Sequence, residues 1–563
     1  MAEAKALSAV TSRMFRSRWD PAGGPSEGVQ LKPGKTARPR LRPALAAVVG
    51  VVLSVALLAG CGPVTPQEAA RARAATSGPV GPMSFQLPAR PSGFDPFAAM
   101  GTADQLLAAA QFEPLVSAVE GRVMPRMADW WAMVGDNKKL VITIKHDRWS
   151  DDVRMGSDDL VFTLEAHLRP DTRSPLLPAL LQIHGAQEFH EGRAPHVAGI
   201  VAETSRGVVI TLTEPNPNFL AQLTGVFVLP RHVYADQDLD RAETFRRPEV
   251  GSGAYLYHLW EGPDQVVLQP NPQVKPHTRL DKVVAKVVGP NEVVPALQRG
   301  ELDVVVDIPS GQLTSVPEGY RVLRAPGDSA VGLSGRGRLA QTEVRQAIAY
   351  ALDRQGILAN ELGGNGRVVD SILLTPDWAA SPDRVRRDHD PSAARELLAA
   401  AGWSASTPLR LVALTDDADR AVWDAVIADL ADVGVAATIT VRPVADRSVV
   451  WSDAGVEGVI ETYRLPVSDP VHIEPWVTCG VVSGYCNPRL DQLLRQSRSE
   501  SQVTERQALV WEADLLLSQE LPVVPLWVPD AVVVVVEGRV GVSPLLQPVT
   551  AMIDFWGPEL AGR

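Results

Sequence analysis

The apolar positions of residues 83–536 follow two spacings, one typical of β-strands and one typical of α-helices. Period-two alternation or a short continuous apolar run favours a strand, whereas apolar residues three and four apart favour a helix. Strands are predicted at 84–87, 139–149, 208–212, 256–270 (two strands around a turn), 283–288, 302–306, 409–414, 436–441, 521–526 and 531–536. Helices are predicted at 103–119, from Ser157 onward, and at 292–299, 342–360, 391–402, 422–432 and 490–519. The body is therefore predicted to be mixed α/β throughout.

Capping residues support several of these elements. Gly300 follows the predicted helix 292–299 as a C-cap glycine, and Pro391 stands at a first-turn position of the next-but-one helix. The order strand, helix, strand over 283–306 predicts a βαβ-type unit. The continuous apolar runs at 521–526 and 531–536 suit strands that are buried on both faces.

A different pattern precedes the folded body. A basic tail leads into an apolar run from Ala44 to Gly60, which closes in Leu58-Ala59-Gly60-Cys61. A positive flank, a short apolar core and small residues before a cut site are typical of an export signal. The cut site resembles the lipobox of bacterial lipoproteins, which implies a lipid on Cys61; an uncleaved membrane anchor is the alternative, since the run is near the lower length limit for spanning a bilayer. Both interpretations put the body outside the cytoplasm, on a flexible tether at 61–82.

Charge narrows the choice of partner. The whole chain has a net charge of −12. Residues 1–60 hold nine Lys/Arg and three Asp/Glu, which leaves 45 Lys/Arg and 63 Asp/Glu in the remainder. An acidic exported body argues against a nucleic-acid partner, which would require a basic face. It also argues against broad adhesion to anionic lipid.

The length of the chain and the number of its cysteines limit the possible domain organisation and crosslinks. With 563 residues the chain is too long for one hydrophobic core, so two or more lobes are expected. The three cysteines are Cys61, Cys479 and Cys486. If Cys61 carries lipid, the other two form an even pair in an oxidising compartment, where a disulfide or two reduced thiols both fit. Two cysteines alone do not complete a zinc shell, so no metal site is expected there.

Three groups of residues are candidates for a reactive site or a metal site. His184, His190 and His196 recur every six residues, but neither helix nor strand periodicity brings all three together. Gly251-Ser252-Gly253 lacks the lysine and the spacing of a phosphate loop and is interpreted as a turn. Ser334 misses the nucleophile-elbow pattern by one residue. No enzyme, cofactor or metal is therefore predicted.

The order of motifs resembles the dipeptide/oligopeptide class of ABC-transporter solute-binding proteins, extracellular family 5. The motifs that carry this resemblance are Gly93-Phe94-Asp95-Pro96, Arg148-Trp149-Ser150-Asp151, Asp158-Asp159-Leu160-Val161-Phe162, Gly185-Ala186-Gln187-Glu188-Phe189, Val250-Gly251-Ser252-Gly253-Ala254-Tyr255, Leu297-Gln298-Arg299-Gly300-Glu301-Leu302-Asp303 and Val344-Arg345-Gln346-Ala347-Ile348-Ala349-Tyr350-Ala351-Leu352-Asp353. Any one motif is weak, but seven in the correct order, within about 84–527, are specific together.

The resemblance implies a periplasmic-binding-protein-like type II fold, with two lobes, a cleft between them and an extra subdomain. On this basis the signal takes 1–60 and the tether 61–82. The first lobe takes 83–325, with the subdomain at about 121–205. The second lobe takes 326–519, and 520–563 returns to the first. The resemblance implies a monomer that holds a small solute, such as a peptide, in its cleft. It also implies a permease in the membrane as the protein partner.

Six residues are predicted to contact the ligand. Tryptophan is favoured because its flat ring both packs and donates a hydrogen bond. Trp378 follows a segment that approaches the ligand in members of the resembled family, and the others lie in family motifs or beside them. The predicted ligand contacts are Phe94, Asp95, Trp378, Tyr463, Asp469 and Trp476.

Some positions depart from the pattern of the family. Ala254 replaces the usual proline of the glycine-rich turn, and Pro466 stands where peptide-binding members carry an aspartate for the ligand's ammonium group. These departures favour an alternative, in which a lipoprotein of the same fold acts in envelope glycolipid assembly or regulation rather than in transport. Cys479 and Cys486 look like a shortened version of the cysteine pair of those members, which implies a disulfide.

Overall fold

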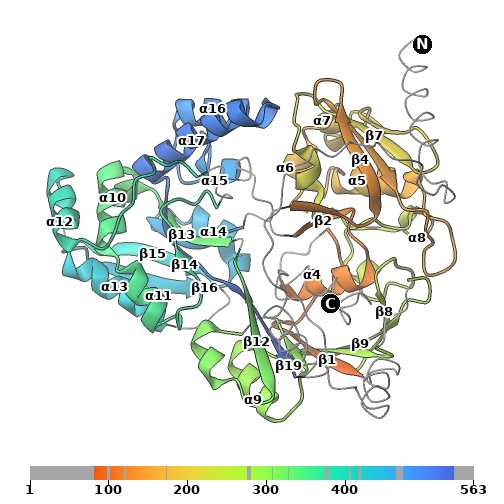
Figure 1. The fold of residues 1–563 in the computed structure, drawn as a ribbon, viewed down its shortest axis with the longest axis horizontal. Coiled ribbons are helices and arrows are strands. Elements are labelled where there is room, and N and C mark those ends of the chain that lie inside the picture. Colours follow the sequence, from red (N-terminus) through yellow and green to blue (C-terminus); the bar gives the residue numbers. More distant parts are fainter. Residues whose placement is uncertain are drawn as a thin grey trace, which may run out of the picture. The chain divides into compact units, whose positions relative to one another are not determined.

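The computed structural model describes residues 82–97, 102–119, 122–172, 174–274, 280–306, 308–327, 329–374, 380–404, 407–415, 420–464 and 473–537 (Figure 1). The predicted export signal, Cys61 and the tether lie outside these residues. Among the helices of the described ranges, none combines the length and the apolar character needed to cross a bilayer.

A seven-stranded sheet is built from both ends of the described chain. Its order is β12 (Tyr320–Ala325), β19 (Ala531–Val536), β11 (Val304–Val305), β1 (Met83–Leu87), β10 (Val283–Val287), β9 (Gln265–Pro270) and β8 (Tyr255–Trp260). Strand β1 runs parallel to both β10 and β11, and the remaining pairs are antiparallel. The helix α9 (Val293–Gln298) connects β10 to β11, which confirms the predicted βαβ-type unit. The helix α4 (Thr102–Gln111) contacts β1 and β8.

A six-stranded sheet forms the second body. Its order is β14 (Arg367–Val368), β18 (Val523–Val528), β13 (Ser329–Gly335), β17 (Gly458–Arg464), β15 (Leu409–Leu414) and β16 (Ala437–Arg442). The helices of this body are α10 (Thr342–Ala351), α11 (Arg354–Asn360), α12 (Pro391–Ala400), α13 (Ala421–Asp432), α14 (Arg447–Ser452), α15 (Glu474–Val477), α16 (Pro488–Ser499) and α17 (Val503–Glu520). Every residue of β18 is buried, as expected for a strand covered on both faces.

Two hydrophobic clusters lie against this second sheet. One joins Leu333 and Ile460 to the apolar faces of α10, α12 and α13. The other joins Ala330 and Tyr463 to α16 and α17. Because successive side chains of a strand point to opposite faces, the sheet is the middle layer of this body.

A four-stranded sheet has a separate core. It consists of β4 (Ala128–Val134), β5 (Lys139–Ile144), β7 (Gly207–Thr211) and β6 (Ile200–Ala202). The strands β2 (Val116–Val119) and β3 (Arg122–Pro125) pair beside it, and the helices of this stretch are α5 (Ser157–His167), α6 (Leu177–Leu180), α7 (Ala186–His190) and α8 (Arg231–Tyr234). Trp149 is fully buried in its core. This sheet occupies the stretch in which the extra subdomain is expected.

Single-turn 3₁₀ helices connect the larger elements. They are η1 (Phe219–Leu223), η2 (Ala242–Phe245), η3 (Pro290–Glu292), η4 (Ser310–Ser315), η5 (Gly337–Ala340) and η7 (Val444–Asp446).

Three predicted helices are shorter than expected. The helix predicted over 103–119 ends at Gln111, and its last residues form β2. The helix predicted over 342–360 is interrupted because Asp353 caps a new helix, its Oδ1 accepting from the Gly356 amide at 2.8 Å. The helical stretch 490–519 is likewise two antiparallel-packed helices, α16 and α17, separated by Glu500–Gln502. In each case a local cap or strand pairing prevails over an apolar periodicity that continues past it.

Candidate ligand-binding site

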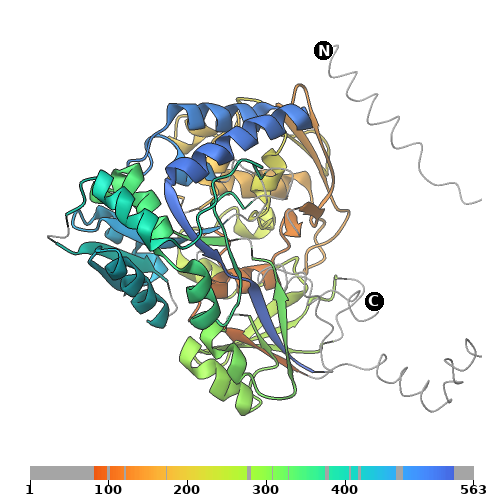
Figure 2. The ribbon, with the colours of Figure 1, turned by 60° about the vertical axis from the view of Figure 1, so that its left-hand side comes forward.

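The chain passes between the two large sheets at two connections that lie side by side. The first joins β12 to β13 and the second joins β18 to β19. Strand β12 pairs antiparallel with β19, and β13 pairs antiparallel with β18, so the two connections leave one sheet together and enter the other together (Figures 1 and 2). The first connection lies where the boundary near 326 is expected. The second lies at Pro529–Asp530, later than the expected boundary at 520, because β18 still pairs with β13.

Close backbone packing holds these connections together. A Cβ atom on Gly327 would lie 1.8 Å from the carbonyl oxygen of Pro529, so a larger residue does not fit there. Gly366, just before β14, has φ +128° and lies against Val528. The Arg367 Nη2 donates to the Gly327 carbonyl oxygen at 3.3 Å. The β12–β13 and β18–β19 connections therefore pack closely, with few bulky side chains between them. Together they are called the joint below.

One buried amide connects the joint to both sheets. Asn365 is 3% exposed, and its Nδ2 lies 3.3 Å from Ser310 Oγ and 3.5 Å from the Asp530 carbonyl oxygen. Ser310 begins η4, whose Leu313 packs in the cluster of β19 residues. Asn365 itself precedes β14 of the second sheet. A single side chain thus touches both bodies at the point where a hinge would bend.

Two of the predicted ligand residues meet on the second sheet. The rings of Tyr463 and Trp476 lie edge to face, with centroids 5.3 Å apart. Tyr463 stands in β17 with no exposed surface, and burial raises the pKa of its phenol. Trp476 stands in α15 and is only partly buried. The contact places one predicted residue beneath the other, with Trp476 nearer the surface.

A charged pair accompanies this contact and was not predicted. Glu461, two residues before Tyr463 and on the same face of β17, is 7% exposed. The Arg447 Nε lies 2.5 Å from Glu461 Oε2, and the Arg447 Nη2 lies 3.2 Å from Oε1. Tyr463, Trp476, Glu461 and Arg447 are called the Tyr463 group below. A buried carboxylate beside an aromatic pair gives this face both polar and apolar surface, which ligand pockets combine.

Phe94 and Asp95 lie elsewhere, in the core of the seven-stranded sheet. Phe94 has no exposed surface and contacts Tyr257 and Trp260 edge to face, at 5.7 and 6.4 Å between centroids. Asp95 is 4% exposed, and its Oδ1 accepts from the Phe97 amide at 2.8 Å. Phe94, Tyr257 and Trp260 are called the Phe94 cluster below. The Gly-Phe-Asp-Pro segment is thus a buried turn, and no described residue of the Tyr463 group contacts it.

Trp378 and Asp469 fall outside the described residues. The segments that lead to and from them are described. Leu373, before Trp378, and Ile473, after Asp469, are buried in the same hydrophobic cluster as Tyr463. Leu373 and Ile473 therefore lie with Tyr463 in the second body.

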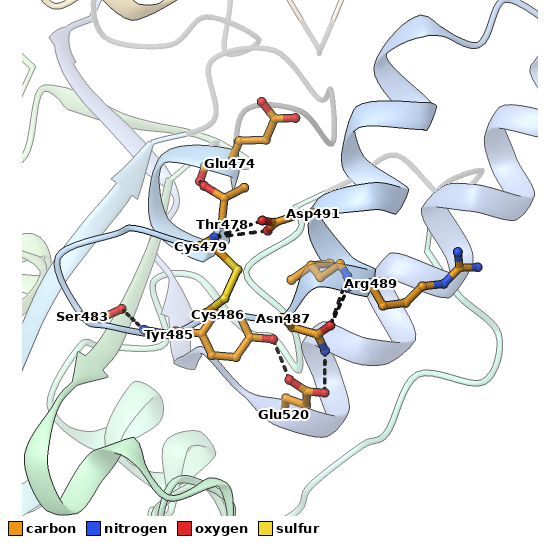
Figure 3. Close-up of a disulfide and its surroundings, with 11 residues drawn as sticks. Glu474, Thr478, Cys479, Ser483, Tyr485, Cys486, Asn487, Arg489, Asp491 and Glu520 are labelled. Carbon is orange, nitrogen blue, oxygen red and sulfur yellow. Dashed lines mark hydrogen bonds between the residues drawn. A yellow bond between two sulfur atoms is a disulfide. The ribbon is translucent and has the colours of Figure 1, made fainter.

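A disulfide joins Cys479 to Cys486 in the loop after α15, as predicted (Figure 3). The loop links two helices, because the Tyr485 hydroxyl and the Asn487 Nδ2 donate to the two carboxylate oxygens of Glu520, at 2.6 and 2.7 Å. Glu520 ends α17, and Asn487 caps the start of α16 by accepting from the Arg489 amide at 2.9 Å. The disulfide therefore stabilises the junction of α16 and α17 rather than contributing a reactive group.

The three regularly spaced histidines have separate surroundings. The His190 Nδ1 lies 3.2 Å from the Leu168 carbonyl oxygen, and the His196 Nδ1 lies 3.3 Å from Glu165. Within the described ranges no group of three or more His, Cys, Asp or Glu side chains is arranged to hold a metal ion.

Cavities occur inside each body. One of about 940 Å³ lies beside α11 and β14, and one of about 730 Å³ lies among residues 146–156, 205–206 and 273. None of the four predicted ligand residues that the structure describes, namely Phe94, Asp95, Tyr463 and Trp476, lines either cavity. The larger one is considered below.

Fold and motifs together define a family. Residues 122–460 match the family of bacterial extracellular solute-binding proteins, family 5. Since the match covers more than half of the chain, the chain belongs to this family, whose members are binding proteins rather than enzymes. This confirms the resemblance on which the predicted fold class depends, and it agrees with the expectation of binding without catalysis.

Individual relatives are distant. A Brucella ovis protein, named as a candidate ABC transporter peptide-binding protein, is 27% identical over 368 residues. The match takes 63% of this chain, and the chain spans 65% of the length of that relative.

Two solved structures show the fold. The structure of AgaA from A. tumefaciens R10, in complex with agropinic acid, superposes with a TM-score of 0.71 at 20% identity, covering 84% of this chain and 97% of that one. The oligopeptide-binding protein AppA of Bacillus subtilis, in complex with a nonapeptide, gives a TM-score of 0.71 at 16% identity, covering 84% and 98%. At these identities the likeness establishes the architecture alone.

Proposed function

We propose that this chain is the extracytoplasmic solute-binding component of an ABC importer, which holds a small solute between two lobes that close by hinge bending. The observation that carries the proposal is the pair of antiparallel connections between β12–β13 and β18–β19. Two adjacent crossings allow one body to rotate against the other while the sheets stay intact. The proposed lobes are about 83–325 with 531–537, and about 329–528.

The ligand is proposed to rest on the second lobe against the Tyr463 group. Tyr463 and Trp476 offer an aromatic surface, and the Arg447–Glu461 pair offers both charges. Such a surface suits a peptide-like or other small polar solute. The ligands of the two solved structures, agropinic acid and a nonapeptide, differ widely, so the fold leaves the solute class open.

Attachment to the membrane is proposed through lipid on Cys61. The support is the sequence pattern Leu58-Ala59-Gly60-Cys61 after an apolar run. Labelling cells with a radioactive or clickable fatty acid is expected to mark the wild type, and Cys61→Ser is expected to lose the label. A label that persists in Cys61→Ser would exclude this attachment.

Native mass spectrometry of the full chain tests the binding function. A solute that co-purifies is expected to add a discrete mass, and small-angle scattering should show a smaller radius of gyration with the solute than after its removal. If saturating solute leaves the scattering curve unchanged, closure by hinge bending is wrong.

The joint itself can be tested with matched glycine variants. Gly327→Ala places a Cβ against the Pro529 carbonyl oxygen, whereas Gly289→Ala meets nothing within 4 Å and has an ordinary φ of −70°. Overpacking of this kind costs about 1–3 kcal/mol. Gly327→Ala is therefore expected to lower stability and to impair closure, with Gly289→Ala like the wild type. Equal scattering changes in both variants would show that bending occurs elsewhere.

A further inference from the structure

The cavity of about 940 Å³ beside α11 and β14 has an unusual charge for this chain. Five arginines and His389 line it, against three aspartates. The arginines are Arg354, Arg367, Arg384, Arg386 and Arg387. The chain as a whole carries −12, so a cationic cavity does not follow from its average composition. A cavity lined by one sign of charge concentrates ions of the opposite sign.

Two of these guanidinium groups are buried and bonded mainly to neutral acceptors. The Arg354 side chain is 5% exposed and donates to the Val369 carbonyl oxygen at 2.7 Å and to that of Pro525 at 3.1 Å. Arg387 is 6% exposed and donates to the carbonyl oxygens of Ser518 and Gln519. Carbonyl oxygens satisfy the hydrogen bonds of a guanidinium but leave its positive charge uncompensated.

One donor remains unused at the cavity wall. The Arg387 Nε is buried and has no hydrogen-bond partner among the described residues. Burial lowers the pKa of Arg387, and the neighbouring Arg354 lowers it further. Asp370 and Tyr350, whose ring lies 5.7 Å from the Arg387 guanidinium carbon, offset part of this positive charge. Buried N–H groups are nearly always paired, so this donor points to a bound acceptor.

Two of the three aspartates that line the cavity already have partners. Asp370 already accepts from Arg354, at 3.3 Å, and Asp353 caps α11. Arg384 is paired with Asp514, outside the lining set. Arg386 is exposed and makes no hydrogen bond or ion pair with any described residue. Among the described residues, the cavity thus has one guanidinium without a partner, that of Arg386, and one unused donor, the Nε of Arg387.

We infer that this cavity binds a small oxyanion, carrying carboxylate or phosphate groups, through Arg386 and Arg387. The site is separate from the proposed solute site, since no residue of the Tyr463 group lines it. Arginine suits this task because its planar fork matches carboxylate and phosphate oxygens. The site also touches the joint, because Arg367 lines the cavity and donates to the Gly327 carbonyl oxygen at 3.3 Å.

Isothermal titration calorimetry of the full chain with inorganic phosphate and with citrate, at constant ionic strength, tests the site. Arg386→Gln is expected to weaken the affinity roughly threefold to tenfold, as for one charge-assisted contact. Arg387→Lys keeps the charge but removes the fork, so a similar loss is expected. Arg495→Gln is the matched control, because Arg495 is exposed on α16 and lines neither cavity; its affinity should stay within about twofold of the wild type.

Hydrogen exchange locates the anion without relying on the variants. Citrate or phosphate is expected to slow amide exchange in 380–389 and at Gly327 of the wild type. Two results would overturn the inference. One is the absence of binding by either anion at millimolar concentration. The other is binding that Arg386→Gln leaves unchanged with no protection of 380–389. If Arg387→Lys fails to fold, Arg386→Gln and the exchange data still decide.

Discussion

The Phe94 cluster and the Tyr463 group both contain residues that sequence motifs single out as ligand contacts, yet their surroundings differ. In the Phe94 cluster three aromatic rings pack edge to face within the seven-stranded sheet, and Phe94 has no exposed surface. In the Tyr463 group Tyr463 also has no exposed surface, but Trp476 is partly exposed, and the buried carboxylate of Glu461 pairs with the exposed Arg447.

A motif residue can be buried because it stabilises the fold or because it belongs to a recognition site, and the two regions differ in this respect. Aromatic rings packed on one another contribute mainly to stability. A buried carboxylate paired with arginine is costly to maintain and contributes little net stability by itself, so its presence is better explained by recognition. The comparison therefore assigns Phe94 and Asp95 to folding, and it proposes Tyr463 and Trp476 for the ligand.

The largest expected effect comes from the Phe94 cluster. Phe94→Ala removes a fully buried ring and leaves a cavity, which costs about 3–5 kcal/mol of unfolding free energy. Urea unfolding of the variant, followed by far-UV circular dichroism, measures this loss. Solute affinity of the molecules that remain folded is expected to be unchanged. A normal unfolding curve with lost affinity would reverse the assignment of this cluster.

The next effect concerns the loop closed by the disulfide. Replacing Cys479 and Cys486 together by serine is expected to cost about 2–3 kcal/mol, because the crosslink no longer limits the unfolded chain. Chemical unfolding of wild type treated with a dithiol reductant should show the same loss. The reductant should then have no effect on the double variant. A double variant as stable as the oxidised wild type would contradict the stabilising role of the disulfide.

Much of the layered fold could be anticipated from local patterns, because β1, β10, β11 and β19 are strongly apolar and the α12 helix starts with a proline at its capped end. Of the four strands at the joint, β18 and β19 were predicted, whereas β12 and β13 were missed. Strand β13 contains Gly332 and Gly335 among serines, so its sequence has the composition of a loop. Only its pairing with β17 and β18 makes it a strand.

The site was only partly predictable for a similar reason. The motif positions gave Tyr463 and Trp476 separately, but the edge-to-face contact of their rings depends on the packing of α15 on the sheet. Arg447 and Glu461 are 14 residues apart, on a helix and a strand, and no local periodicity relates such positions. Asn365 has no motif at all, and its role follows from the meeting of η4, β14 and the β18–β19 connection.

The stability of the first lobe should depend on pH through His167. His167 is fully buried on α5, and its Nδ1 lies 2.7 Å from Ser174 Oγ. Burial, with a smaller contribution from the charge of Arg169, lowers the pKa of His167 to about 3. The unfolded chain binds a proton below about pH 6.5 while the folded chain does not. Stability is therefore lost as the pH falls from about 6.5 toward 3, by about 2 kcal/mol at pH 5 from this residue.

Urea unfolding at pH 7.5 and pH 5 checks this contribution. His167→Gln is expected to lose less stability between the two pH values than the wild type does, by about 2 kcal/mol. Any constant cost of the substitution appears at both pH values and cancels from the difference. Parallel pH profiles for the variant and the wild type would show that His167 is protonated in the folded chain.

Tyr463→Phe is expected to change stability least, while its effect on ligand binding is the most informative. Tyr463→Phe removes one hydroxyl and leaves the ring against Trp476, so unfolding free energy is expected to shift by no more than about 1 kcal/mol. Burial raises the pKa of Tyr463, so the phenol stays protonated. If the Tyr463 group receives the solute, affinity for the co-purified compound should fall several-fold in Tyr463→Phe, and calorimetry would measure it. Wild-type affinity in Tyr463→Phe and in Trp476→Phe would place the solute elsewhere and remove the distinction between the two regions.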